Sequence, residues 1–250
     1  MQAYLTLARR ELASFFVSVT GYLIIAAAMF LIGLCWVVLV VQLQSQATPV
    51  PVTQLFYSTE YFWLILLLIT PVITMRLFAL EKYSGTFETL MTTPVTDLQV
   101  VLAKFTGAMI FYILVWLPSL GCMLVLRPFV NNPGALDSGL LGSTYLGIFL
   151  LGGLFMSMGC FASALTRSQI TAAMISFTLG LTLFLLSFLP GRLPSIVSWQ
   201  DEVLSHVALH DHMNDFARGI VDLRHVVFYI SLTVLFLFLT VRVVESRRWK

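Results

Sequence analysis

The sequence predicts an all-α polytopic membrane protein with six transmembrane helices, and three observations predict it. First, 59% of the residues are hydrophobic and only 10% are charged, whereas soluble domains carry about 25% charged residues. Second, the sequence contains six mainly apolar stretches, each long enough to cross a bilayer. Third, if these stretches cross the membrane in turn, the basic residues are distributed unequally between its two sides. Such a chain lacks the polar surface that a soluble fold needs.

The gaps between charged residues place the six spans. A helix needs about 20 apolar residues to cross a hydrocarbon core that is about 30 Å thick. Mainly apolar stretches of this length cover residues 20–41, 55–78, 105–126, 140–164, 169–189 and 226–244. The second extends past Glu60 and Arg76, and the last past Arg242, and these charges are expected to lie near the membrane surfaces. The first is longer than the roughly 7–15 residues of a signal-peptide core, so we expect it to stay in the protein. Residues 1–250 are expected to form a single transmembrane domain.

The basic residues predict the orientation of these spans. Four of the 14 lysines and arginines fall on the side opposite the termini: Arg127, Arg192, Arg218 and Arg224. The others fall on the side of both termini. Because lysine and arginine accumulate on the cytoplasmic side, we expect both termini in the cytoplasm.

The segment before the first span predicts an amphipathic helix over residues 1–16. Its apolar residues recur at helical spacing: Leu5, Ala8, Leu12 and Phe15. Charged residues, Arg9 to Glu11, fall between them. This pattern is typical of a helix that lies along the membrane interface.

The internal segment 80–97, between the second and third spans, is too patterned for a simple loop. Gly85 permits a sharp turn of the backbone. Thr86 can cap a short helix whose apolar face carries Phe87, Leu90 and Met91.

Two further signals show where this short helix ends and where the next helix begins. Pro94 ends it, because proline lacks the backbone N–H and disfavours helical geometry in the residue before it. Thr96 and Gln99 then form a capping-box pattern for the helix that leads into the third span. We therefore expect a short, rigid cytoplasmic helix that can transmit force from a soluble partner to the membrane helices.

The external segment 190–225 contains all four histidines of the chain. Its apolar residues fit short re-entrant helices that the rest of the protein shields from lipid. His206 and His210 have the i, i+4 spacing that can hold zinc or copper, and His212 is close by. No cysteine joins them and their flanking order is irregular, so the three histidines are weak metal candidates and interfacial histidines are the favoured interpretation.

Small and polar residues within the spans give two more expectations. In the fifth span, Thr171, Thr178 and Thr182 fall near one helical face and could form a polar wall of a pathway. Alternatively, their hydroxyls bond back to their own helix. In the fourth span, the pairs Gly153/Ser157 and Gly159/Ser163 predict close helix packing.

Two stretches of the sequence resemble a known family. The first resembles the signature of ABC-2 type exporter permeases, and reads Glu81-Lys82-x-x-Gly85-Thr86-x-Glu88-x-Leu90-x-x-x-Pro94-Val95, followed by Leu102-x-Lys104. The second resembles the gliding-motility-associated branch of that superfamily, and reads His212-x-x-x-Phe216-x-Arg218-Gly219-x-x-Asp222-x-Arg224, with Ser246-Arg247-Arg248-Trp249.

This resemblance implies a type V exporter fold in the bacterial cytoplasmic (inner) membrane. It implies a coupling helix that docks on an ATP-binding subunit, with coupling residues Glu81, Gly85, Thr86, Phe87, Glu88, Leu90 and Pro94. It implies that spans two and five line the pathway and that short external helices close the exit. The implied partners are two ATP-binding subunits, which carry ATP and Mg, a second permease, identical or related, and membrane lipids, with room for a periplasmic auxiliary protein.

Several motifs are absent from the sequence. It has no G-x-x-x-x-G-K-[ST] loop, HExxH pair or GxSxG elbow, so we expect no ATPase site, no other enzymatic activity and no cofactor in this chain. A net charge of +2 does not indicate nucleic-acid binding. The expected function is that of the permease subunit of an ATP-driven exporter. Three alternatives stay open: a copper-handling permease, an ATPase-driven scaffold that acts on a periplasmic partner, and an ion-coupled carrier, which the charge-free centres of the spans disfavour.

Overall fold

The computed structural model describes residues 2–45, 51–87, 95–127, 137–189 and 206–248, and the secondary structure assigned in these ranges is helical. The helices are α1 (Gln2–Val17), α2 (Val19–Ser45), α3 (Val52–Ser58), α4 (Glu60–Thr74), α5 (Ala79–Ser84), α7 (Asp97–Leu126), α8 (Ser138–Leu165), α9 (Gln169–Leu186), α11 (Leu209–Ala217) and α12 (Leu223–Arg248).

Six helical segments in the described part of the chain are long and apolar enough to cross a membrane. They are α2, α4 together with α5, α7, α8, α9 and α12. This arrangement confirms the predicted all-α polytopic fold with six membrane-length helices. Helix α7 begins at Asp97, well before the expected start of the third span, so Lys104 lies inside the helix.

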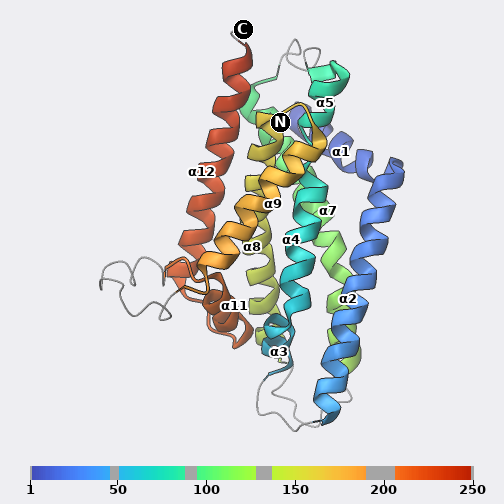
Figure 1. The fold of residues 1–250 in the computed structure, drawn as a ribbon, viewed down its shortest axis with the longest axis vertical. Helices are drawn as coiled ribbons and strands as arrows, with labels where there is room; N and C mark the ends of the chain where they lie inside the picture. Colours follow the sequence, from blue (N-terminus) through green and yellow to red (C-terminus); the bar gives the residue numbers. More distant parts are fainter. Residues whose placement is uncertain (1, 46–50, 88–94, 128–136, 190–205, 249–250) are drawn as a thin grey trace.

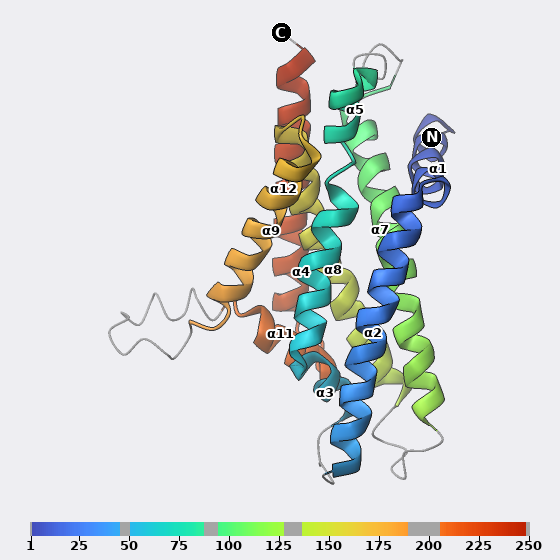
Figure 2. The same ribbon diagram turned by 45° about the vertical axis from the view of Figure 1, so that its right-hand side comes forward.

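The two ends of the bundle carry different short elements. Helix α1, helix α5 and the end of α12 lie at the same end, which we call the terminal end (Figures 1 and 2). Helices α3 and α11 lie at the opposite end (Figure 1). The chain thus returns to the end where it starts, as an even number of spans requires.

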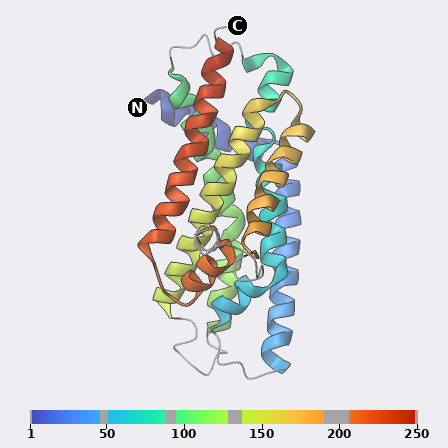
Figure 3. The same cartoon turned by 60° about the vertical axis from the view of Figure 1, so that its left-hand side comes forward.

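Helix α8 occupies the centre of the bundle. It contacts α4, α7, α9, α11 and α12, and these helices surround it (Figure 3). Small residues allow this close packing: a Cβ added at Gly159 would lie 2.1 Å from Oγ1 of Thr74 on α4. The predicted packing role of Gly159 is therefore confirmed.

Filling this contact is expected to destabilise the bundle. Gly159→Leu places a side chain where Thr74 already lies, and such overpacking costs about 1–3 kcal/mol. The matched control is Gly142→Leu on the same helix, because a Cβ added at Gly142 meets no atom within 4 Å. Thermal unfolding in detergent should show a lower midpoint for Gly159→Leu than for Gly142→Leu. Equal midpoints would contradict the tight α4–α8 contact.

Helix α1 packs along α7, and part of this contact is ionic. Ala8 and Phe15 are buried, whereas Leu5 is 55% exposed and Glu11 is only 8% exposed. Glu11 can be buried because α7 offers it a cation, Lys104, whose Nζ lies 3.0 Å from its carboxylate. The position of this helix along the membrane interface stays a prediction.

Candidate functional site

The first candidate site is the segment that joins α4 to α7 at the terminal end. Helix α4 ends at Thr74 and α5 begins at Ala79, and the turn between them leaves backbone groups without helical partners. The hydroxyl of Ser163 on α8 accepts hydrogen bonds from the N–H groups of Phe78 (3.0 Å) and Ala79 (3.1 Å). It also donates to the carbonyl of Met75 (3.1 Å). Ser163 therefore fixes both ends of the turn to the central helix.

A buried ionic cluster ties the same segment to α1 and α7. Nζ of Lys104 lies 3.0 Å from Oε1 of Glu11 and 2.8 Å from Oε1 of Glu81. Nη2 of Arg10 lies 3.4 Å from the same oxygen of Glu81. The Lys104 side chain is only 3% exposed. Two cations thus balance two carboxylates, as burial of charge requires.

Lys82 attaches α5 to the end of α8. Its Nζ donates to the carbonyl oxygen of Ala164, in the last turn of α8, where the helix dipole favours a positive charge. The same Nζ lies 5.2 Å from the centre of the Phe87 ring, within the range of a cation–π contact. Phe87 is itself only 8% exposed. These contacts hold Phe87 against the bundle.

The tip of the segment faces away from the bundle. Gly85 ends α5 with φ = 76°, a left-handed conformation that glycine adopts without steric cost. Tyr83, just before it, is 79% exposed. Thr86 already has helical geometry, whereas a cap at Thr86 would make Phe87 the first helical residue. The hydroxyls of Thr86 and Ser84 are hydrogen-bonded to each other at 2.9 Å.

The structure thus separates the predicted coupling residues into two groups. Glu81 and Phe87 face inward and anchor the segment, whereas Gly85 and Thr86 are exposed at its tip. Glu88, Leu90 and Pro94 lie outside the described residues. The capping box of Thr96 and Gln99 is confirmed, since each side chain bonds the backbone N–H of the other residue at 3.3 Å.

Sequence reasoning missed several residues of this site. Glu11, Ser163 and Tyr83 had no assigned role in it, and Lys82 and Lys104 appeared only as letters of a motif. A signal for Glu11 was present, because it is a charged residue that lies on a helix between residues of the predicted apolar face. Its partner could not be identified, since Lys104 is 93 residues away in the chain.

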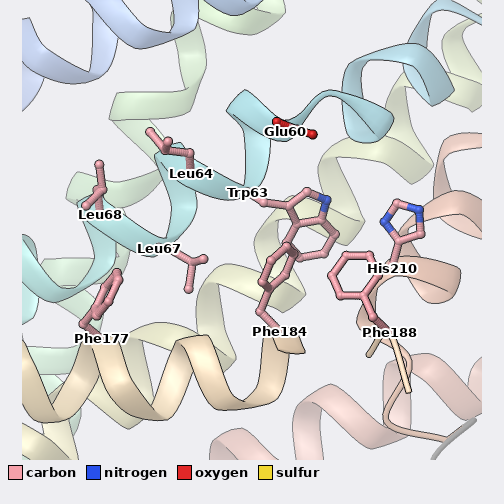
Figure 4. Close-up of a pocket in the computed structure, with 9 residues that line it drawn as sticks. All are labelled: Glu60, Trp63, Leu64, Leu67, Leu68, Phe177, Phe184, Phe188 and His210. Atoms are coloured by element: carbon pink, nitrogen blue, oxygen red, sulfur yellow. The ribbon is translucent and has the colours of Figure 1, made fainter. Parts of the chain in front are cut away.

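The second candidate site is a pocket of about 640 Å³ between α4 and α9 (Figure 4). Its volume falls within the range of roughly 300–1,000 Å³ that is common for small-molecule sites. The lining residues are Glu60, Trp63, Leu64, Leu67, Leu68, Phe177, Phe184, Phe188 and His210. Figure 4 shows Glu60, Trp63 and His210 toward one end, and Leu68 and Phe177 at the other.

The predicted pathway threonines do not line this pocket. Thr171, Thr178 and Thr182 are all exposed on α9. The hydroxyls of Thr178 and Thr182 donate to the carbonyls of Met174 and Thr178, each at 2.8 Å, which is the alternative of bonding within the helix. Instead α9 contributes Phe177 and Phe184 to the pocket wall. The prediction considered only the polar residues of the fifth span, so it did not include these aromatic residues.

The histidines near α11 point to different neighbours. His210 lines the pocket, whereas the His212 ring stacks on that of His225, with ring centres 3.9 Å apart. Within the described ranges, no group of three or more His, Cys, Asp or Glu side chains could hold a metal ion. His206, His210 and His212 are therefore not brought together as a coordination site in this structure.

Burial of His212 predicts a pH-dependent stability. The residue is 3% exposed, and burial, followed by the charges of His225 and His206, lowers its pKa from 6.5 to about 4, while Asp222 acts in the opposite direction. Above pH 6.5 the imidazole is neutral in both the folded and the unfolded state. As the pH falls from 6.5 toward 4, the unfolded state gains a proton that the folded state does not bind, so stability is lost.

The expected loss reaches about 3 kcal/mol by pH 4. Thermal unfolding midpoints measured from pH 7.5 to pH 4 should fall more steeply for the wild-type chain than for His212→Phe, which keeps an aromatic ring but cannot titrate. Parallel pH profiles for the two proteins would show that His212 is not the responsible group.

Six membrane-length helices with α8 at their centre, an anchored segment at one end and a pocket between two spans define a multi-pass membrane protein. The family model of the ABC-2 family transporter proteins matches residues 18–189, from α2 through α9. The match covers more than half of the chain, so the chain belongs to this family and is a membrane permease of an ABC transporter. As the membrane component rather than the ATPase, a permease of this family works with a separate ABC ATP-binding subunit. A comparison with curated proteins found no match.

Proposed function

We propose that this permease couples ATP binding and hydrolysis in a separate subunit to the export of a substrate across the bacterial cytoplasmic membrane. The observation that carries the proposal is the anchoring of α5. Lys104 joins Glu81 to α1 and α7, while Ser163 and Lys82 join the same segment to α8. A push on the exposed tip would therefore move three helices of the bundle together.

The terminal end would face the cytoplasm in this arrangement, with two ATP-binding subunits docked on two permeases. An exposed face of α9 is open to a second permease in this arrangement: Ile170 is 74% exposed and Met174 is 65% exposed. Thr171, Thr178 and Thr182 are also exposed and would then face the second subunit across the pathway. A pocket of about 640 Å³ favours a transported substrate over a scaffold that only moves a periplasmic partner. The C-terminal motif supports placement in the gliding-motility-associated branch.

Docking of the ATP-binding subunit is tested at Tyr83. Tagged chain purified from its native host in mild detergent should bring down a subunit that carries the ATP-binding motif. Tyr83→Glu is expected to weaken or abolish this co-purification, because it adds a charge to a side chain that is 79% exposed at the tip. Tyr83→Phe, which keeps the ring, is the matched control and should behave as wild type. Recovery of the wild-type chain without any ATPase subunit would contradict the proposed function.

A further inference from the structure

Trp63 and His210 present their rings to the pocket between α4 and α9. Nε1 of Trp63 and Nδ1 of His210 are buried within the protein and have no hydrogen-bond partner among the described residues. Trp63 as a whole is only 4% exposed, and Figure 4 shows its indole nitrogen on the edge that lies toward His210. Because these two nitrogen atoms have almost no accessible surface, a ligand in the pocket would contact ring atoms and not these nitrogens.

The charge at this end of the pocket is negative. Glu60, in the first turn of α4, is the only lining residue with a formal charge among the nine described, and it is exposed at the mouth. Its carboxylate would attract a cation and repel a phosphate or a carboxylate. No lysine or arginine belongs to the lining set to offset it.

Aromatic rings form the wall next to this carboxylate. The ring centres of Trp63 and Phe184 are 5.0 Å apart, and those of Phe184 and Phe188 are also 5.0 Å apart. The His210 ring completes the series, 5.7 Å from Phe188 and 6.1 Å from Trp63. Aromatic faces beside a carboxylate stabilise an organic cation by cation–π attraction.

The other end of the pocket is apolar. Leu64, Leu67, Leu68 and Phe177 line it, on the side away from His210 (Figure 4). Leu64 and Leu68 remain 44% and 45% exposed in the single chain, so this part can accept a large apolar body. The pocket therefore distinguishes the two ends of an amphiphile.

We propose that the substrate of this pocket is a lipophilic organic cation: a molecule with a positively charged nitrogen group and a large apolar body. The charged group pairs with Glu60 and lies against the aromatic wall. The apolar body lies along Leu64, Leu67 and Leu68. This assignment rests on the proposed export function, because it takes the pocket to lie on the transport path.

Binding is tested on the purified complex of permease and ATP-binding subunits in nanodiscs, without nucleotide. The probe is rhodamine 6G, an aromatic cation with N–H donors and an ester carbonyl, followed by fluorescence polarisation. Fluorescein, which has the same ring frame but is anionic, is the matched ligand. We expect saturable binding of rhodamine 6G and binding at least about tenfold weaker for fluorescein.

Two variants locate the site. Glu60→Gln is expected to weaken rhodamine 6G binding by about tenfold, and Phe184→Leu, which removes an aromatic face of the wall, by about threefold. Glu245→Gln on α12 is the matched control, since Glu245 pairs with Arg242 and does not line the pocket. Equal affinities for the two dyes, or wild-type affinity in Glu60→Gln, would overturn the assignment.

The same preparation separates this inference from the proposed function. Glu60-dependent binding of rhodamine 6G without stimulation of ATP hydrolysis would support the assigned ligand chemistry and contradict the proposed coupling. Conversely, an ATPase that depends on the Tyr83 tip, together with no cation-selective binding, would support the proposed coupling and overturn the ligand assignment.

Discussion

Lys104→Met is expected to destabilise the protein by about 3–5 kcal/mol, because it removes the buried cation of the cluster and leaves two carboxylates with only the exposed Arg10 to offset them. Glu11 and Glu81 lie 3.0 Å and 2.8 Å from Nζ of Lys104, and their side chains are only 11% and 15% exposed. Without Lys104, their mutual repulsion would separate α1 and α5 from α7. The expected result is a lower thermal midpoint in detergent and a lower yield of folded protein.

Two controls show whether charge imbalance is the cause. The triple variant Glu11→Gln/Glu81→Gln/Lys104→Met removes the three buried charges, leaves the exposed Arg10 in water and is expected to recover much of the lost stability. Arg242→Met removes a cation from an exposed ion pair at 2.9 Å, where the arginine side chain is 63% exposed. Its expected cost is below about 1 kcal/mol. A triple variant no more stable than Lys104→Met would show that the lysine acts through packing and not through its charge.

Gly85→Pro is expected to abolish coupled ATP hydrolysis and export while leaving membrane insertion intact. Gly85 has φ = 76°, whereas proline is restricted to φ near about −65°, so the tip cannot keep its turn. The effect is conformational and not a clash, because a Cβ added at Gly85 meets no atom within 4 Å. The six spans are unchanged by a substitution at this exposed position.

The matched control is Gly85→Asn, because asparagine tolerates the left-handed region better than other residues with a side chain. It should retain most of the substrate-stimulated ATPase activity that Gly85→Pro loses. Protease protection of the termini in membrane vesicles measures insertion for both variants. Normal ATPase stimulation in Gly85→Pro would contradict the coupling role of the tip.

Local features of the fold could be predicted because local physics sets them. The six spans follow from the length of the apolar stretches, since a bilayer accepts only helices of about 20 apolar residues whose backbone groups are paired within the helix. The capping box of Thr96 and Gln99 depends on residues three positions apart, and the turn at Gly85 depends on one residue. Gly159 signalled close packing because only small residues permit it.

The contacts that define the candidate sites were decided only by the tertiary structure. The Glu11–Lys104 and Phe78–Ser163 contacts join residues that are 93 and 85 positions apart in the chain. Hydropathy and local spacing carry no information about which residues meet at such separations. The helix rotation that exposes Thr178 and turns Phe177 into the pocket is likewise invisible in a span that is apolar on nearly every side. Hydropathy determines that a helix enters the membrane. Its rotation and its partners are set by how side chains from distant helices fit together.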